Sequence, residues 1–449
     1  MDERLRDKRI LVIGMARSGM AAAELLLSLG AQVVLSDTRA DVAGLEGLLE
    51  AGCEARLGEP SETLVAGCDA VVVSPAVPME APVIREAARL GIPVWAELEL
   101  ASRYIQGTQV AITGTNGKTT TASLVGDILK NAGRMAYVAG NIGLPLSAIA
   151  TKVARGEVAV IEVSSFQLEH IELFHPHIAA ILNLTPDHLN RHGTMEAYGA
   201  LKESMLKNQT ERDFFIYNAD DAFCRQVAER AVARKVPFSR TQALTTGAWV
   251  QDGQLMLEGR ALCPVEELSL PGPHNLENAL AAAAIAAQLD VPAPVIRHTL
   301  RSFAGVEHRM ETVRTLHGVR WINDSKGTNP ESSMRGVEGM QVPTILIAGG
   351  DEKGTDFTGF AEAVAKNENI RHVILIGKTA DRILQALQKA GYTAVTMAGY
   401  DFAAAVMGAR ALSEEGGTVL LSPACASFDM FKDFEDRGRQ FKELVNSLT

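Results

Sequence analysis

Cysteine and long apolar runs are scarce in this sequence. The 449 residues include five scattered cysteines and no C-x-x-C pair, so neither a disulfide framework nor a cysteine zinc site is expected. This cysteine usage is typical of a reducing compartment, and we expect a cytoplasmic protein. No apolar run approaches the ~18 residues of a membrane span, and no signal peptide precedes Arg9, so we expect no membrane partner.

Positive charge is also in short supply. The chain has 43 Lys and Arg against 54 Asp and Glu, and no basic face stands out, which argues against a nucleic-acid partner. The hydrophobic share of 47% and the charged share of 22% are ordinary for a globular protein. A chain of 449 residues is too long for one ordinary core, so we expect two or three domains.

The most informative stretch is 109–122, which reads Q-V-A-I-T-G-T-N-G-K-T-T-T-A. A run rich in β-branched apolar residues ends in a turn that contains Gly114 and Gly117, and a helix is predicted over 119–131. Glycines let backbone amides approach a ligand closely, and the positive end of the following helix attracts phosphate oxygens. The stretch therefore predicts a nucleoside triphosphate site.

Two side chains in this turn suit the same ligand. Lys118 would reach the β- and γ-phosphates, and the Thr119 hydroxyl would ligate Mg²⁺. The usual P-loop has four residues between its first glycine and the Gly-Lys pair, whereas here Gly114 stands two residues before Gly117. The strand–turn–helix context favours the nucleotide site over a mere tight turn.

The beginning of the chain contains a second glycine-bearing turn. A strand over 9–13 leads to Gly14, Ala16 and Gly19, and the strand after the next helix ends at Asp37. The spacing is similar to a dinucleotide fingerprint, but alanine replaces its middle glycine. NAD, another nucleotide-bearing ligand and a purely structural turn all remain open, and we favour the second. The groups that could grip such a ligand are Asp37, Thr38, Arg39 and the 74–78 turn that starts with Ser74.

Polar residues follow two buried strands of the central region. Glu162 ends the strand 158–163, where a Mg²⁺ ligand belongs beside a P-loop, although a solvated edge acid is the alternative. His188 stands in a polar turn after the strand 178–182, which favours ligand or catalytic use over packing. The neighbouring histidines 170, 175, 177 and 192 are expected at the surface or in packing. Spacing alone does not distinguish Lys202 from Lys207 as a functional lysine.

The last third of the chain predicts another doubly wound sheet. Its strands alternate with helical patterns, and polar residues gather just after the strands, where such sheets bind ligands. Cys425 is expected to be a small buried thiol. The fold class is α/β, with three domains: a Rossmann-like unit over 1–97, a P-loop ATPase-like unit over 98–305 and a Rossmann-like doubly wound sheet over 306–449.

These motifs together resemble the Mur ligase family, the ATP-dependent amino-acid ligases of bacterial cell-wall assembly. The resemblance runs the length of the chain and rests on the compressed T-G-T-N-G-K-T-T loop, I-E-V-S-S-F-Q-L at 161–168, T-P-D-H-L at 185–189 and H-N-L-E-N at 274–278. H-R-M-E at 308–311, N-D-S-K-G-T-N at 323–329 and the stretch 422–434 are similar to the branch that adds D-glutamate. Diaminopimelate- and lysine-adding relatives carry Asp-Asn-Pro where this chain has Asp-Ser-Lys-Gly-Thr.

The resemblance implies a reaction and its participants. D-Glutamate would be joined to UDP-N-acetylmuramoyl-L-alanine through an acyl phosphate, in the cytoplasmic synthesis of peptidoglycan precursors. ATP and Mg²⁺ would be required, with two ions expected and Mn²⁺ as an alternative metal. The resemblance implies a monomer whose C-terminal domain closes over ATP, with hinges near Glu97 and Gly305.

The resemblance also implies roles for single residues. Lys118, Glu162, His188 and Lys202 would be catalytic, and Thr119, Glu162, His188 and a carbamylated Lys202 would hold metal. ATP would contact Gly114, Thr115, Asn116, Gly117, Lys118, Thr119, Thr120, Asn275, Arg309 and Asp324. The UDP-bearing substrate would contact Ala16, Arg17, Asp37, Thr38, Arg39, Ser74, Asn141 and Ser164. The D-glutamate pocket would contain Lys326, Thr328, Lys353, Ser427 and Phe434.

Three other functions remain as alternatives. A folylpolyglutamate-synthase-like ligase shares the P-loop style and the glutamate chemistry, but it gives no reason for the opening UDP-type domain. A P-loop nucleotide switch without ligase chemistry is a second alternative, but it gives no role to Glu162, His188 or the residues 324–326. A nicotinamide dehydrogenase would use only the first glycine turn.

Overall fold

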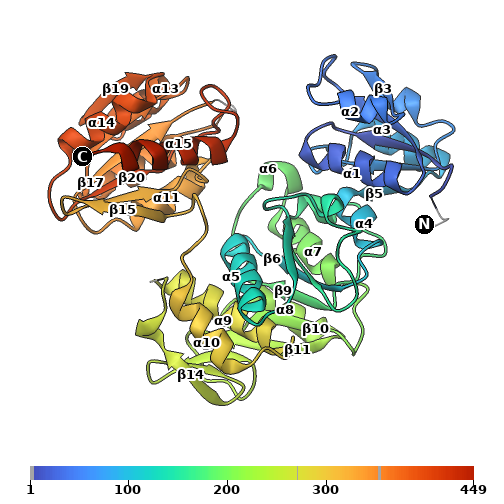
Figure 1. Ribbon diagram of the computed structural model, residues 1–449, viewed down its shortest axis with the longest axis horizontal. Helices are drawn as coiled ribbons and strands as arrows, with labels where there is room; N and C mark the ends of the chain where they lie inside the picture. Colours follow the sequence, from blue (N-terminus) through green and yellow to red (C-terminus); the bar gives the residue numbers. More distant parts are fainter. Residues whose placement is uncertain (1–4, 271, 352–354) are drawn as a thin grey trace. The chain divides into compact units, whose positions relative to one another are not determined.

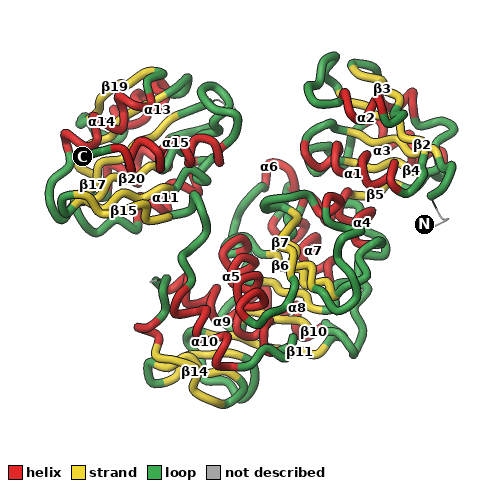
Figure 2. Tube along the Cα trace, viewed as in Figure 1, coloured by secondary structure: helices red, strands yellow, loops and turns green. Residues whose placement is uncertain are grey.

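The computed structural model describes residues 5–270, 272–351 and 355–449 (Figure 1). Lys353, expected in the D-glutamate pocket, lies outside the described residues. The chain forms two compact units, Met1–Phe303 and Ala304–Thr449. Figure 2 shows that helices and strands alternate through most of both units, as the sequence pattern predicts.

The first unit begins with a five-stranded parallel sheet in the order β3-β2-β1-β4-β5. The four residues of β4 read A-V-V-V and are all buried, because helices cover both faces of such a sheet. Valine and isoleucine suit this environment. The strands are β1 (Arg9–Ile13), β2 (Gln32–Asp37), β3 (Glu54–Leu57), β4 (Ala70–Val73) and β5 (Val94–Ala96), and the helices are α1 (Arg17–Ser28), α2 (Glu46–Glu50) and α3 (Pro82–Leu90).

The same unit contains a nine-stranded sheet in the order β14-β13-β12-β11-β10-β9-β6-β8-β7. Strands β6 to β12 are joined in parallel, and the hairpins β12-β13-β14 add an antiparallel edge. The central strands are β6 (Thr108–Thr113), β7 (Ala136–Gly140), β8 (Val158–Glu162), β9 (Ile178–Ile181) and β10 (Phe214–Asn218). The outer strands are β11 (Arg234–Ser239), β12 (Ala248–Gln251), β13 (Gln254–Leu257) and β14 (Arg260–Pro264).

Helices cover this larger sheet and join it to the first one. Helix α9, Pro273–Ala287, buries its alanine-rich stretch and packs on α5 (Lys118–Asn131). One hydrophobic core includes side chains of both sheets, among them Val12 and Ile161. The other helices are α4 (Glu97–Ser102), α6 (Leu189–His192), α7 (Met195–Glu203), α8 (Ala222–Arg230) and α10 (Ala293–Ser302).

The second unit is built on a six-stranded sheet in the order β15-β16-β20-β17-β18-β19, in which only β15 runs antiparallel to its neighbour. Helices α11 (Pro330–Glu338), α12 (Thr358–Lys366) and α13 (Ala380–Lys389) pack on one face, and α14 (Phe402–Leu412) and α15 (Phe434–Ser447) on the other. The strands are β15 (Glu311–Leu316), β16 (Val319–Asn323), β17 (Thr344–Gly349), β18 (Ile370–Ile376), β19 (Val395–Gly399) and β20 (Thr418–Leu421). Among the described residues, no helix has the length and apolar character needed to cross a lipid bilayer.

Candidate nucleotide and metal site

Two glycines shape the turn between β6 and α5. Gly114 has a φ of +148° and Gly117 a φ of +83°, which side chains other than hydrogen rarely tolerate. A Cβ added at position 114 would lie 3.0 Å from the Leu182 Cβ, and one at position 117 would lie 2.2 Å from Asn278 Oδ1. The backbone of the turn is therefore in close contact with its neighbours, and both positions require glycine.

Hydrogen bonds from the loop after β9 hold this turn in place. Thr115 Oγ1 donates to the Thr185 carbonyl at 3.1 Å and accepts from the Thr185 amide at 3.0 Å. Asn183 accepts from the Asn116 amide at 2.9 Å and donates to the Asn116 carbonyl at 3.2 Å. These reciprocal pairs fix the turn before any ligand binds, which suits a preorganised phosphate site.

Four of the predicted site residues meet where β7, β8 and α5 come together. Glu162 is 2% exposed; its Oε2 accepts from Thr119 Oγ1 at 2.8 Å, and its Oε1 accepts from Asn141 Nδ2 at 2.8 Å. Lys118, the first residue of α5, folds back and donates from Nζ to the Gly114 carbonyl at 2.9 Å. The structure thus places the expected phosphate and metal groups together, and Thr120 is buried beside them in α5.

Lys202 and Lys207, which spacing could not distinguish, lie in opposite environments. Lys202 is 1% exposed, donates from Nζ to the Gly114 carbonyl at 3.0 Å, and lies 4.5 Å from the centre of the Tyr198 ring. Burial, followed by the positive charge of Lys118, lowers the pKa of Lys202 well below its ordinary value. Lys207 is exposed and donates to a backbone carbonyl.

His188 stands at the start of α6 in a left-handed conformation, with a φ of +53°. Its ring centre lies 4.8 Å from that of Phe166, and its Nε2 lies 3.6 Å from Asp187 Oδ2. The side chain is 44% exposed, so a metal ion or water can reach its nitrogens. Ser164 lies in the loop before Phe166 and donates from Oγ to Gln167 Oε1 at 3.0 Å.

These donors fit a magnesium ion that arrives with a nucleotide. In the described part of the chain, no group of three or more His, Cys, Asp or Glu side chains could hold a metal by itself. The Thr119 hydroxyl and the Glu162 carboxylate, 2.8 Å apart, are hard oxygen donors. Mg²⁺ usually takes one or two such groups together with phosphate oxygens and water. The set therefore suits Mg²⁺ with a triphosphate and does not suit a permanent structural metal.

The turn after β1 is filled by groups of the protein itself. Asp37 Oδ2 accepts from the Met15 amide at 2.8 Å and from Arg39 Nη2 at 2.8 Å, while Ser74 Oγ donates to the Gly14 carbonyl at 2.6 Å. The hydrogen bonds from Arg39 hold the pKa of Asp37 well below its ordinary value. The side chain of Asp37 is 8% exposed and that of Arg39 is 57% exposed. Asp37 therefore holds the backbone amide of Met15 and orients Arg39, and Arg39 is the one of these two side chains that faces solvent.

The other glycine of this turn has a packing role. A Cβ at Gly19 would lie 1.9 Å from the Gly14 carbonyl oxygen, so only glycine lets α1 pass this close to the turn. Ala16 precedes α1 in an extended conformation and is exposed, as are Arg17 and Thr38. Arg17 Nη2 donates to the Gly143 carbonyl at 2.6 Å, which links the turn to the loop that contains Asn141.

In the second unit, Asp324 follows β16 and is 3% exposed. Its Oδ2 accepts from Ser422 Oγ at 2.7 Å, and its Oδ1 accepts from the Met310 amide at 3.3 Å. Burial raises the pKa of Asp324 to about 6, against the opposing effect of the nearby positive charge of Arg309. Half-buried Arg309 therefore lies close enough to buried Asp324 for its charge to act on this carboxyl group.

The other described C-terminal candidates lie on the loops after β16 and β20, except Phe434, which is the first residue of α15. Lys326 Nζ lies 5.9 Å from the centre of the Phe434 ring, and the Thr328 amide donates to the Lys326 carbonyl at 2.8 Å. Ser427 is 2% exposed. Cys425 is a buried free thiol, as predicted, and burial raises its pKa to about 11.

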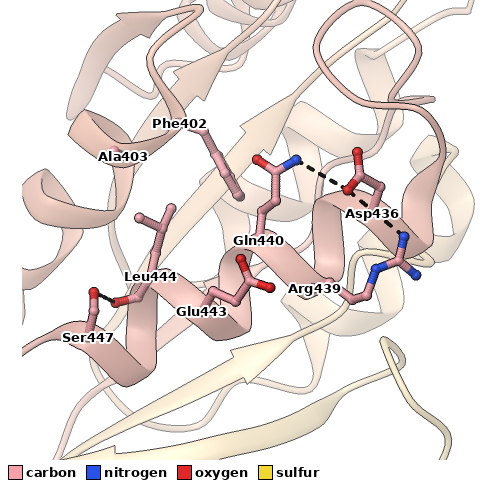
Figure 3. A pocket seen from close by; sticks show the side chains of 8 residues that line it. All are labelled: Phe402, Ala403, Asp436, Arg439, Gln440, Glu443, Leu444 and Ser447. Carbon is pink, nitrogen blue, oxygen red and sulfur yellow. Dashed lines mark hydrogen bonds and ion pairs between the residues drawn. The ribbon is translucent and has the colours of Figure 1, made fainter.

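A surface hollow lies between α14 and α15. Figure 3 shows Asp436, Arg439 and Glu443 of α15 projecting around it, together with Phe402 of α14. Arg439 Nη2 lies 3.9 Å from Asp436 Oδ1. Of the predicted ATP, UDP-substrate and D-glutamate residues that the structure describes, none lines this hollow.

Helix α9 begins at Pro273, because proline at the first helical position has its φ already set and needs no hydrogen-bonded amide. The residue before the helix is Gly272, so Asn275, a predicted ATP contact, lies within the first turn.

Two buried side chains that form hydrogen bonds to distant parts of the chain were not predicted from the sequence to have a functional role. His192 is 2% exposed and accepts or donates a hydrogen bond of 2.9 Å with Ser165. Arg437 is 0% exposed, and its guanidinium donates to the Ser325 carbonyl at 2.9 Å and the Cys425 carbonyl at 3.2 Å. No local signal marks either residue, because their partners lie 12 to 112 positions away in the sequence.

Models of three protein domains match successive parts of the chain. The Mur ligase MurD-like N-terminal domain matches residues 8–96, the Mur ligase middle domain matches 112–286, and the Mur ligase glutamate ligase domain matches 308–425. The three-domain α/β organisation predicted from the sequence is thereby confirmed.

Curated relatives match over nearly the whole chain. A UDP-N-acetylmuramoylalanine–D-glutamate ligase of Alkaliphilus oremlandii is 46% identical, with 99% of each chain covered. The enzyme of the same name from Pelotomaculum thermopropionicum is 46% identical, with 98% of each covered. That from Caldanaerobacter subterraneus subsp. tengcongensis is 43% identical, with 99% of each covered.

Solved structures share the fold at lower identity. The UDP-N-acetylmuramate-alanine ligase MurC of Thermotoga maritima has a TM-score of 0.62 at 20% identity, covering 98% of this chain and 99% of that one. MurF of Acinetobacter baumannii has a TM-score of 0.62 at 17% identity, covering 98% and 93%. The identity to full-length relatives, together with the three domain matches, leads to one conclusion: the chain belongs to the Mur ligase family.

Proposed function

We propose that this protein is an ATP-dependent ligase that joins D-glutamate to UDP-N-acetylmuramoyl-L-alanine in the synthesis of peptidoglycan precursors. The observation that carries the proposal is the cluster at the P-loop of buried Glu162 and Thr119 with Asn141 and Lys118, in a chain 46% identical to a D-glutamate ligase over 99% of its length. A carboxylate, a hydroxyl and a cation at a phosphate-binding turn suit phosphoryl transfer, which requires positioning and charge neutralisation above all.

The ATP site is proposed to hold the triphosphate on the turn 114–120. Lys118 would exchange its bonds to the Gly114 and Thr115 carbonyls, both 2.9 Å, for phosphate oxygens. Thr119 and Glu162 would hold Mg²⁺, which shields the phosphate oxygens and polarises the γ-phosphorus when bound. Asn275, Arg309 and Asp324 are proposed to contact adenine, phosphate and ribose.

Lys202 is proposed to react with carbon dioxide. Only a neutral amine is nucleophilic, and burial lowers the pKa of Lys202 well below its ordinary value, which favours that form. The amine nitrogen would form a bond to carbon and release a proton, leaving a carbamate anion. The nearby Lys118 charge, which opposes an ammonium at Lys202, would stabilise the carbamate. With His188, the carbamate would offer donors for a second Mg²⁺.

The reaction is proposed to take two steps. A carboxylate oxygen of the muramoyl-alanine substrate attacks the γ-phosphorus of ATP, and the bond to ADP breaks. The amine of D-glutamate then attacks the acyl carbon, loses a proton, and phosphate leaves. Asn141 would hold the substrate carboxylate or the γ-phosphate, and the lysine at position 118 would neutralise charge that develops in the first step.

The substrate-binding roles are proposed to divide among the domains. Residues 1–97 would bind the UDP part, with Arg39 as the outward-facing cation and Ala16, Arg17, Thr38 and Ser74 around it. Residues 98–305 would bind ATP, and Ser164 would contact the muramoyl-alanine part. Residues 306–449 would bind D-glutamate through Lys326, Thr328, Lys353, Ser427 and Phe434, because cations and hydroxyls suit a dicarboxylate.

Several finer properties are part of the same proposal. We propose two metal ions per active site, with Mn²⁺ able to replace Mg²⁺, and a monomeric enzyme. A titration of the phosphate-release rate with each metal and sedimentation at working concentration test these points. A second-order dependence on free metal is expected.

The deciding experiment measures phosphate release with ATP, Mg²⁺, D-glutamate and UDP-N-acetylmuramoyl-L-alanine. Release is expected only when both substrates are present, and the product should carry one added glutamate by mass spectrometry. Replacing D-glutamate by L-glutamate should abolish release, whereas a folylpolyglutamate-type enzyme would prefer the L form.

Lys118→Ala is the matched variant for this assay. We expect it to lower the rate by about 10³-fold, because a cation that neutralises transferring phosphate is removed from a preorganised site. Lys207→Ala, which removes an exposed lysine of the same domain, should leave the rate unchanged. Phosphate release that needs neither amino acid nor nucleotide sugar would refute the ligase assignment.

A further inference from the structure

A column of side chains in successive contact connects His188 and Lys202, two of the residues proposed to hold metal. The ring centre of His188 lies 4.8 Å from that of Phe166, and Phe166 lies 5.3 Å from His192. His192 stacks on Tyr198 with centres 5.3 Å apart and planes inclined by 18°. Lys202 Nζ lies 4.5 Å from the centre of the Tyr198 ring. The two groups proposed to hold the second metal ion are therefore the two ends of one column.

His192 is the centre of this column. Its side chain is 2% exposed, and its Nε2 lies 2.9 Å from Ser165 Oγ, in the loop that follows Glu162. Its Nδ1 lies 3.9 Å from Glu169 Oε1. A tautomer with hydrogen on Nδ1 faces that carboxylate and leaves Nε2 to accept from the serine hydroxyl. His192 thus contacts the loop after Glu162 as well as both ring neighbours.

Both ring neighbours are fixed by further contacts. The Tyr198 hydroxyl lies 3.4 Å from Thr115 Oγ1 in the P-loop. The Arg191 guanidinium carbon lies 5.2 Å from the centre of the Phe166 ring, and its Nε donates to Glu169 Oε1 at 3.0 Å. A displacement of the His192 ring would therefore shift the side chains of both His188 and Lys202.

We propose that His192 is a positioning residue that sets the spacing between His188 and Lys202, through Phe166 on one side and Tyr198 on the other. This inference rests on the proposed metal roles of those two residues. Packing alone would be served equally well by an apolar ring. The hydrogen bond to Ser165 and the nearby Glu169 carboxylate instead fix the direction of this ring, as partners outside a metal's own ligands commonly do.

Three variants separate the ring from its hydrogen bond. His192→Ala removes both, His192→Phe keeps a ring that can stack, and His192→Gln keeps a polar group that can reach Ser165. His298→Ala, at an exposed histidine of α10 in the same unit, is the control. Binding of Mn²⁺ in the presence of a non-hydrolysable ATP analogue is measured by electron paramagnetic resonance, and kcat and KM are measured for each substrate.

We expect His192→Ala to weaken Mn²⁺ binding by about tenfold and to lower kcat by about 10- to 100-fold, the range seen when partners of metal ligands are removed. The KM for ATP should change less than twofold, because the P-loop contacts remain. His192→Phe should recover only part of the metal affinity, because its ring can stack but no polar contact fixes its direction, and His192→Gln should recover less because it lacks the ring. His298→Ala should match the original protein.

Two results would overturn the proposal. One is Mn²⁺ affinity and kcat within twofold of the original protein in His192→Ala. The other is a loss of nucleotide binding and thermal stability in all three variants, which marks a merely structural histidine. The outcome is separate from that of the ligase assignment, because Mn²⁺ binding with the ATP analogue is measurable whether or not glutamate is joined to any acceptor.

Discussion

The two glycine-bearing turns of the first unit look alike in sequence but differ in what their carboxylates do. Beside the turn after β1, Asp37 at the end of β2 accepts from the backbone amide of Met15 and from Arg39, so the carboxylate belongs to the scaffold. Beside the turn after β6, Glu162 at the end of β8 accepts from the side chains of Thr119 and Asn141, both of which can turn to a ligand. The carboxylate beside the turn after β1 is thus occupied by groups of the protein backbone and Arg39. The carboxylate beside the turn after β6 instead bonds side chains that a ligand could replace.

The glycines, by contrast, serve similar purposes in the two turns. Gly14 has a φ of +88°, and Gly114 and Gly117 have φ values of +148° and +83°. Close packing also excludes a side chain in both turns: a Cβ at Gly19 would lie 1.9 Å from the Gly14 carbonyl oxygen, and one at Gly117 would lie 2.2 Å from Asn278 Oδ1. A glycine pattern after a strand therefore indicates a sharp turn, and the partners of the nearby acid indicate whether a ligand is expected.

The substitution expected to have the largest effect on one of these two turns is Glu162→Gln, which should lower kcat. The amide still fits beside Thr119 and Asn141, but it lacks the negative charge that attracts Mg²⁺. We expect kcat to fall by about 100-fold, with the urea midpoint of unfolding unchanged. Activity that persists at the original level, measured by phosphate release, would contradict the role of this carboxylate.

A smaller effect is expected from Gly19→Ala. The added methyl group would overlap the Gly14 carbonyl oxygen, so α1 must move, at a cost of about 2 kcal/mol in the free energy of unfolding. Urea denaturation followed by circular dichroism measures this. Gly47→Ala is the control, because a Cβ at Gly47 in α2 would meet nothing within 4 Å. Equal stabilities of the two variants would show that α1 is not tightly held.

Asp37→Asn should affect binding more than catalysis. Without the carboxylate, Arg39 loses a charged partner at 2.8 Å and becomes mobile. We expect the KM for the nucleotide sugar to rise about tenfold, the effect of losing one hydrogen bond to a charged group, while kcat stays within twofold. A matching fall in kcat would place Asp37 closer to the chemistry than the structure indicates. Asp41→Asn, at an exposed neighbour, is the control.

The smallest effect concerns pH. Because hydrogen bonds from Arg39 lower the pKa of Asp37, this carboxylate stabilises the folded state above its unfolded pKa near 3.8, and the contribution is lost as pH falls further. The difference in unfolding free energy between Asp37→Asn and the original protein should therefore be constant from pH 5 to 7 and should shrink below about pH 4. A difference that grows at low pH would refute the sign of the shift.

Local sequence patterns were sufficient to predict much of the fold and part of the site. Buried strands flanked by turns predicted the α/β class, and the compressed P-loop predicted the phosphate turn, because both signals lie within a few residues. The contact of Glu162 with Thr119 follows from two neighbouring strand ends.

Long-range packing determined the rest. Lys202 and Lys207 are equivalent in pattern, and only the burial of one against Gly114 distinguishes them. The buried state of Arg437 likewise depends on a contact with Ser325, which lies 112 positions away in the sequence. The burial of these side chains arises from tertiary contacts and cannot be predicted from the spacing of residues in the sequence.

The contact between Gly117 and Asn278 has a consequence for how the protein is made. The phosphate turn ends at residue 117, yet the side chain that braces it belongs to α9, which starts at Pro273. On the ribosome, the turn leaves the exit tunnel long before its brace is synthesised. A nascent chain that stops ahead of α9 should therefore be unable to retain ATP, and nucleotide would help folding only in the last third of synthesis.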